Sequence, residues 1–151
     1  MKDKPRALAI GVAEVVRDGH DIAIFGLGAM LPEAMRLAKL LEREGFSAAV
    51  INPRFAKPID RECVSEFGRH CGLLITLEDH VLAGGFGSAV LEAVNELELT
   101  VPVVRVGWPD LFIEHGKVEA LREKYGLTAE SAMAKARPHL SAMESRRMAV
   151  R

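Results

Sequence analysis

The chain has 151 residues, about the usual size of one domain, and its 49% hydrophobic and 27% charged residues exclude a disordered or fibrous protein. Its 20 Lys and Arg residues are balanced by 21 Asp and Glu residues, so no excess of positive charge draws it to nucleic acid or anionic lipid. No apolar run approaches the roughly 20 residues of a membrane span, and the N-terminus lacks a secretory signal. We therefore expect a soluble, cytoplasmic protein with neither nucleic acid nor membrane as a partner.

Short apolar runs alternate with amphipathic stretches, a pattern typical of α/β domains with a largely parallel sheet. The predicted strands cover residues 13–16, 21–25, 47–51, 73–77 and 103–106. The first strand is short and ends at Asp18-Gly19, a turn signal that favours a tight reversal into the second, so we expect an antiparallel edge strand. The other four are nearly continuous in Ile, Val, Leu and Ala, as expected of strands covered on both faces.

Helices are predicted between and after these strands. They cover residues 31–44, a segment that starts at Asp60 as its N-cap, and residues 87–97, 117–124 and 129–139. Together with the strands they predict a three-layer α/β/α sandwich around a five-stranded, mostly parallel mixed sheet. We expect a single domain over residues 1–151 with a core at about 5–140. The polar ends, MKDKPR and SAMESRRMAVR, are expected to fray.

Two glycine-rich segments lie where a strand gives way to a helix. Gly26-Leu27-Gly28 lacks the third glycine of a dinucleotide-binding fingerprint, and an acidic residue in the first helical turn opposes phosphate binding, so a tight turn is the favoured interpretation. The loop at residues 84–88 precedes a first turn without an acid. Its backbone N–H groups and Ser88 could therefore receive an anion, although Gly85 and Gly87 are more often explained by close approach to a neighbouring strand.

Charged residues follow two of the predicted strands, at the edge where ligands collect in open α/β sheets. Glu78 and Asp79 are neighbours in sequence and should point to opposite faces, so they cannot share a proton, and anchoring of a loop is the favoured interpretation. Arg54 and Lys57 lie in a Pro-stiffened loop. They are placed to pair with carboxylates of a neighbouring domain or subunit, or else they belong to a solvated loop.

Other chemistry finds little support in the sequence. The five histidines are scattered without the spacing of a metal site, and Ser88 and Ser131 lack the context of a nucleophilic serine. Cys63 and Cys71 are too few for a disulfide framework, and we expect two reduced, structural thiols.

Five segments occur in a specific order and spacing. They are AIFGLGAML, NPRFAKPID, LLITLEDHVLAGGFGSAV, VGWPDLFIEHG and the turn Tyr125-Gly126-Leu127-Thr128. Between about Pro5 and Leu140, this series resembles the last domain of the 1-deoxy-D-xylulose-5-phosphate synthases. Transketolase and the β subunits of 2-oxo-acid dehydrogenases are broader relatives that share the fold of this domain.

The resemblance implies the C-terminal domain of a thiamine-diphosphate and Mg²⁺ enzyme, a homodimer that condenses pyruvate with glyceraldehyde 3-phosphate for isoprenoid, thiamine and pyridoxal synthesis. In that family, a Gly-Asp-Gly motif of the first domain and a glutamate of the second domain serve the cofactor. The present chain contains no Gly-Asp-Gly. The resemblance therefore assigns it no catalytic, cofactor-binding or metal-binding residue, and implies a five-stranded mixed sheet that packs on an upstream pyrimidine-binding domain.

Two hypotheses follow. The first is a structural and dimer-interface domain that is inactive alone, with Arg54, Lys57, Glu78, Asp79, Gly85, Gly87 and Ser88 as possible interface or anion contacts. The second is a stand-alone or regulatory module that binds an anion or nucleotide with the 84–88 loop and Arg54 or Lys57. An equivalent domain of another transketolase-like enzyme remains a further alternative.

Overall fold

The structure is a computed structural model that describes residues 7–149. It contains one five-stranded sheet in the order β1-β3-β2-β4-β5. The strands are β1 (Glu14–Arg17), β2 (Ile22–Gly26), β3 (Ala48–Asn52), β4 (Leu73–Val81) and β5 (Val103–Trp108). β1 runs antiparallel to β3, and the other neighbouring pairs are parallel. The prediction of a mixed sheet with an antiparallel first strand at its edge is confirmed, but β1 pairs with β3 and not with β2, the strand that follows the Asp18-Gly19 turn.

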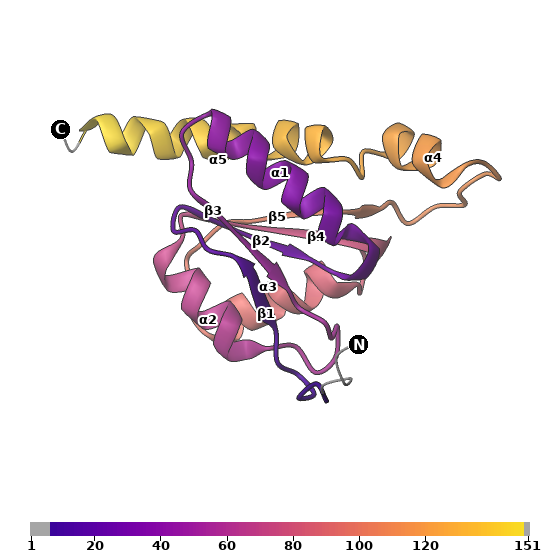
Figure 1. Cartoon of the computed structure of the whole chain (residues 1–151), viewed down its shortest axis with the longest axis horizontal. Coiled ribbons are helices and arrows are strands. Elements are labelled where there is room, and N and C mark those ends of the chain that lie inside the picture. The colour runs from indigo at the N-terminus through magenta and orange to yellow at the C-terminus, as the bar shows by residue number, and fades with distance from the viewer. Residues whose placement is uncertain (1–6, 150–151) are drawn as a thin grey trace, which may run out of the picture.

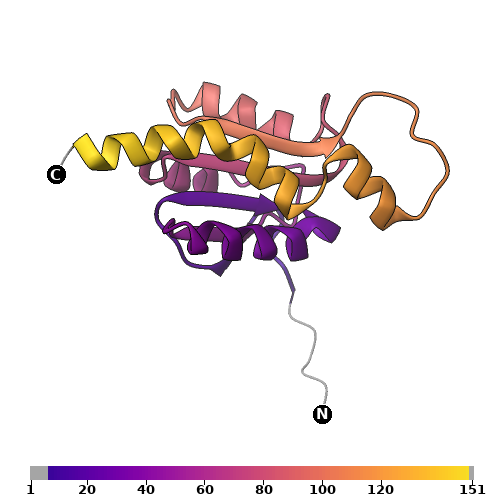
Figure 2. The same ribbon diagram turned by 90° about the horizontal axis from the view of Figure 1, so that it is seen from above.

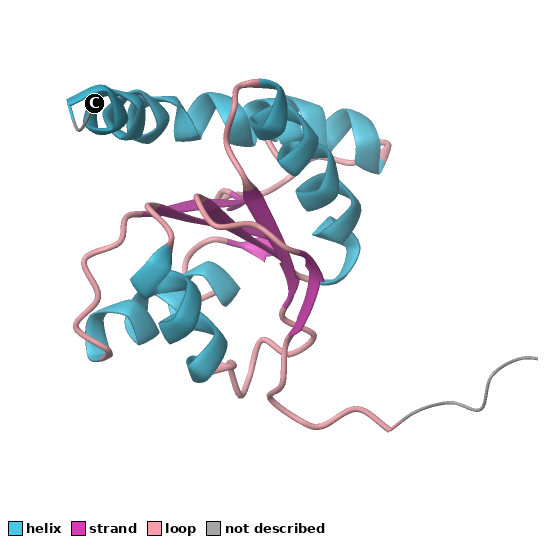
Figure 3. Ribbon diagram, turned by 60° about the vertical axis from the view of Figure 1, so that its left-hand side comes forward, coloured by secondary structure: helices cyan, strands magenta, loops and turns pink. Residues whose placement is uncertain are grey.

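Helices cover both faces of the sheet. They are the short 3-10 helix η1 (Gly28–Met30), α1 (Leu31–Arg43), α2 (Arg61–His70), α3 (Phe86–Glu96), α4 (Val118–Tyr125) and α5 (Ala129–Ala149). α1 and α5 lie on one face, and α2 and α3 lie on the other (Figures 1 and 3). α4 extends beyond the end of the sheet on a long loop (Figure 2). The predicted three-layer sandwich is confirmed.

The buried side chains of the strands alternate between two hydrophobic clusters. Ile22 and Ile24 of β2 point toward α1 and α5, whereas Ala23 and Phe25 point toward α2 and α3. Each is at most 2% exposed, which explains why this strand appears as a continuous apolar run in the sequence. Full burial of one large aliphatic or aromatic side chain stabilises the fold by about 1.5–3 kcal/mol.

α5 is longer than predicted. The sequence predicts an end at residue 139 and a frayed segment from Ser141, but the helix continues to Ala149. Pro138 is exposed within it, and Leu140 beyond the proline is fully buried. Arg147 then ties the last turn to the main body through an ion pair with Asp21. The predicted helix end at residue 139 is therefore wrong. Fraying of residues 141–149 stays a prediction, and the predicted N-terminal fraying, in MKDKPR, falls on residues outside the described range.

β4 is also longer than predicted, because it continues from residue 77 to Val81. Glu78, Asp79 and His80 thus belong to the strand itself and do not follow it. Within residues 7–149, no helix has the length and apolar character that crossing a membrane requires.

Candidate functional site

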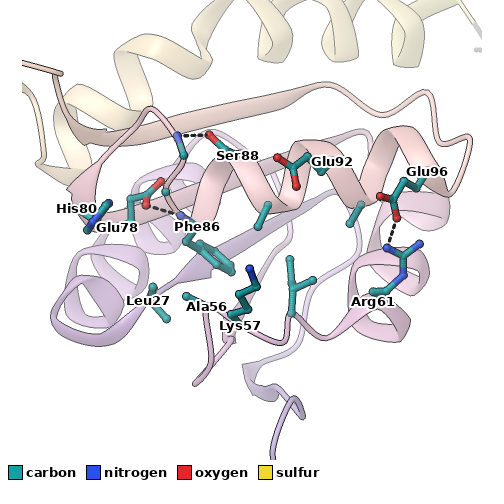
Figure 4. A pocket seen from close by; sticks show the side chains of 15 residues that line it. Leu27, Ala56, Lys57, Arg61, Glu78, His80, Phe86, Ser88, Glu92 and Glu96 are labelled. Carbon is teal, nitrogen blue, oxygen red and sulfur yellow. Dashed lines mark hydrogen bonds and ion pairs between the residues drawn. The ribbon is translucent and has the colours of Figure 1, made fainter.

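A surface pocket of about 510 Å³ lies at the carboxyl edge of the sheet. Two of its lining residues, Leu27 and Glu78, lie at the ends of the adjacent strands β2 and β4. After β2 the chain continues into α1 on one face of the sheet, and after β4 it continues into α3 on the other face, so the two connections diverge at this point. Open α/β sheets bind ligands in the crevice formed by such a divergence. α3 and residues 56–61 form the pocket walls (Figure 4).

Glu78 is the buried centre of this region. Its side chain is 0% exposed. Its two carboxylate oxygens accept hydrogen bonds from the backbone N–H group of Phe86, at 2.6 Å (Figure 4), and from that of Gly87, at 2.8 Å. These groups begin α3, where unpaired N–H groups and the helix dipole favour negative charge. Glu78 therefore provides the anion for this helix start from within the chain.

The 84–88 loop therefore does not offer the free N–H groups that the less favoured alternative, an anion site, requires. The N–H groups of Ser88 and Ala89 donate to the carbonyl oxygen of Gly85, while those of Phe86 and Gly87 donate to Glu78. The first turn of α3 contains no acidic residue of its own, because the carboxylate that satisfies it belongs to Glu78 in β4, eight residues before Phe86. The interpretation of Glu78 as an anchor for the loop is confirmed.

The glycines of this loop allow close contact. A Cβ atom added at Gly85 would lie 2.2 Å from Oε2 of Glu78, and one at Gly87 would lie 2.7 Å from Oγ1 of Thr76. Both distances are too short for real side chains. Close approach to β4, the commoner explanation for such glycines, is confirmed at these two positions.

Ser88 is held by a side chain that the sequence analysis missed. Its hydroxyl donates to the carbonyl oxygen of Leu82 at 2.8 Å and accepts from Nη1 of Arg105 at 2.9 Å. Arg105 is in β5, where it interrupts an otherwise apolar run. This cation within a predicted strand was the feature of the sequence that could have revealed the contact. Ser88 is thus engaged in joining the loop to β5.

Asp79 points away from Glu78, as predicted. Its carboxylate accepts a hydrogen bond from Nε1 of Trp108 at 2.7 Å and pairs with Arg122 of α4. Tyr125 packs edge-on against Trp108, with 5.8 Å between ring centroids. Asp79 therefore connects β4 to α4, and the inference that the two carboxylates do not act as a dyad is confirmed.

The two cations of the 53–58 loop have different surroundings. Arg54 forms a 2.7 Å ion pair with Glu14, so a carboxylate of the same chain already occupies the partner role predicted for another domain or subunit. Lys57 is exposed, lines the pocket, and has no ion pair within residues 7–149 (Figure 4). Of the two, only Lys57 remains a candidate contact for another molecule.

The pocket has a mixed electrostatic character. Arg61 pairs with Glu96 along one wall, and Glu92 lines the same wall. A phosphate site would require a concentration of positive charge, and the pocket does not have one. Within the described residues, no group of three or more His, Cys, Asp or Glu side chains is placed to hold a metal ion.

The remaining candidates are the glycine turn after β2 and the two cysteines, and their surroundings are those of structural residues. Gly28 has a φ of 57°, a left-handed conformation that glycine favours, and it begins the tight turn between β2 and α1. Cys63 and Cys71 are free. Burial raises the pKa of the Cys63 thiol to about 12 and that of Cys71 to about 11, with nearby carboxylates adding to both shifts. Such thiols have little nucleophilic thiolate at neutral pH.

Comparison with known proteins adds independent information. The chain is 55% identical over 141 residues to the 1-deoxy-D-xylulose-5-phosphate synthase of Acidobacterium capsulatum, which covers 93% of this chain and 22% of that protein. The synthase of Methylacidiphilum infernorum is 54% identical over 133 residues, covering 88% of this chain and 21% of that protein. The chain thus spans about a fifth of the length of these relatives.

A solved structure agrees with the fold. A split-gene transketolase, described as an inactive β4 tetramer, is 42% identical with a TM-score of 0.82, and the match covers 89% of this chain and 44% of that one. A transketolase from Pichia stipitis shares the fold alone, at 14% identity and a TM-score of 0.55, over 88% of this chain and 18% of that one. The family model described as "Transketolase, C-terminal domain" matches residues 11–132. The chain belongs to the transketolase C-terminal domain family.

Proposed function

We propose that this chain serves as the C-terminal domain of a 1-deoxy-D-xylulose-5-phosphate synthase, where it has a structural and dimer-interface role and no turnover alone. The single observation that carries the proposal is the 55% identity over 93% of the chain to such a synthase. The complete enzyme would condense pyruvate with glyceraldehyde 3-phosphate, using thiamine diphosphate and Mg²⁺, as a cytoplasmic homodimer. This chain would form its last folding unit.

The described residues do not fit the thiamine cofactor. The sequence has no Gly-Asp-Gly motif, and three carboxylates near the pocket, Glu78, Asp79 and Glu96, are engaged with the loop, Trp108 and Arg61. The remaining lining carboxylate, Glu92, does not by itself make a set of oxygen ligands for Mg²⁺. The alternative of an anion-binding module loses its main support, because Glu78 already occupies the start of α3.

A chimera tests the proposal. This chain would replace the matching region of the Acidobacterium capsulatum synthase, and formation of 1-deoxyxylulose 5-phosphate would be measured with pyruvate, glyceraldehyde 3-phosphate, thiamine diphosphate and Mg²⁺. We expect activity from the chimera and none from the isolated chain or from the relative without that region. Turnover by the isolated chain would contradict the proposal. So would an inactive chimera, provided that the unaltered relative is active.

A further inference from the structure

Residues 109–126, which contain the projecting loop and α4, include no buried residue. The residues on either side of this segment differ. Gly107 is buried near the end of β5, and Leu127, directly after the segment, is 0% exposed. The segment is therefore anchored in the core at both ends but contributes no buried side chain of its own. We call residues 109–126 the arm (Figure 2).

A surface cleft of about 540 Å³ lies between the arm and the body of the domain. Most residues that line it are charged or polar, and they come from α4 on one side and from α1 and α5 on the other. The charged ones are Glu119, Arg122 and Glu123 from α4, and Glu33, Arg36 and Glu130 from the other two helices. Four of the six carry negative charge, so the two sides of the cleft have no complementary charge that would draw them together. The space beside α4 is thus a polar cleft and not a hydrophobic core.

Asp79 of β4 is the main attachment of the arm to the body. One carboxylate oxygen pairs with Arg122 in the middle of α4, and the other accepts Nε1 of Trp108, the residue before the arm, at 2.7 Å. Tyr125 adds an edge-on contact with the Trp108 ring. Among the residues that the structure describes, Asp79–Arg122 is the only ion pair that joins the arm to the rest of the chain, because the other ion pair of the arm is internal to it.

We infer that the arm opens as a hinged unit while the sheet remains folded, and that the Asp79–Arg122 ion pair is its latch. An element without buried side chains adds little to the cooperative core, so it opens at a much lower free energy than global unfolding requires. Gly126 ends α4 with a φ of 77°, a left-handed conformation that glycine adopts freely, and provides one hinge. Opening widens the cleft between α4 and the other two helices. The hinge is a property of this chain and does not depend on the proposed function.

Native-state hydrogen exchange of the 151-residue chain at low urea concentrations tests the hinge. After correction for intrinsic rates, the backbone amides of residues 121–125 should exchange at least about 100-fold faster than that of Ile24 in β2. They should also share one opening equilibrium constant, because they open together. Protection equal to that of Ile24 would show that α4 unfolds only with the sheet. Protection that rises from the ends of α4 toward its middle would show simple fraying, and either result would overturn the inference.

Asp79→Asn tests the latch. The variant keeps the size of the side chain and can still accept the hydrogen bond of Trp108, but it loses the ion pair with Arg122. Exchange of the α4 amides should become about fivefold faster relative to that of β2, at the upper end of the range for partly exposed ion pairs. Glu44→Gln is the matched control, because it removes an ion pair with Arg137 that joins the end of α1 to α5. It should leave the exchange of α4 unchanged.

A second variant separates the latch from a general loss of stability. Arg122→Gln should accelerate α4 exchange as much as Asp79→Asn does, and the double variant should add no further acceleration, because both changes break the same ion pair. Additive effects of the two changes would overturn the latch. So would an unchanged exchange rate in Asp79→Asn, or an equal acceleration in Glu44→Gln.

Discussion

Replacing Glu78 by Gln should strongly destabilise this domain. The variant keeps the side-chain volume but removes the charge, and its amide can accept only one of the two N–H groups that Glu78 accepts from Phe86 and Gly87. A buried donor left without a partner costs about 1–3 kcal/mol. Losing the negative charge at a helix start costs about 0.3–1 kcal/mol, and more when the geometry is partly buried. The free energy of unfolding should therefore fall by about 2–4 kcal/mol.

Urea unfolding followed by far-UV circular dichroism measures this change. For a chain of this size the loss corresponds to a fall in melting temperature of about 5–15 °C. Glu92→Gln, an exposed position on α3, is the control and should stay within about 0.5 kcal/mol of the unaltered chain. If Glu78→Gln were as stable as Glu92→Gln, the assignment of Glu78 as the anchoring charge of α3 would be refuted.

Two other features lead to predictions from ionisation. Burial raises the pKa of Asp21, but its hydrogen bonds with Arg147 and the Ser47 N–H lower it more, so it lies below the ordinary value. Its stabilising contribution is thus present above about pH 4 and lost as pH falls through the depressed pKa. In urea titrations, the free energy of unfolding of Asp21→Asn should be about 1 kcal/mol lower than that of the unaltered chain near pH 7, and it should depend less on pH below about pH 4. A pH profile of the unfolding free energy that is the same in both proteins would contradict this. Because burial raises the pKa of Cys63 and Cys71 to about 12 and 11, Ellman's reagent should label them at pH 8 only in denaturant; rapid labelling of the folded chain would exclude the buried arrangement.

The elements of the fold could be predicted because burial leaves a clear pattern in the sequence. β2 and β3 are covered on both faces, and their residues are correspondingly apolar without alternation. Asp60 was predicted as an N-cap from its position after a proline, and its carboxylate accepts the N–H of Cys63 at 2.9 Å. In such cases a local preference and the tertiary environment favour the same structure.

The failures share a different cause, which is contact between distant segments. The last turn of α5 is polar in sequence and is held by Arg147, which pairs with Asp21 and stacks over Phe46 at 4.8 Å from the ring centroid. Arg105 reaches Ser88 across 17 residues of chain. No window along the sequence contains both members of these pairs, so hydrophobic periodicity could not reveal them.

The carboxyl edge combines both kinds of behaviour. An edge of this kind binds anions in many α/β proteins because helix N-termini offer unpaired N–H groups there. Here Glu78 satisfies the start of α3, and its negative charge disfavours a second anion at the same position.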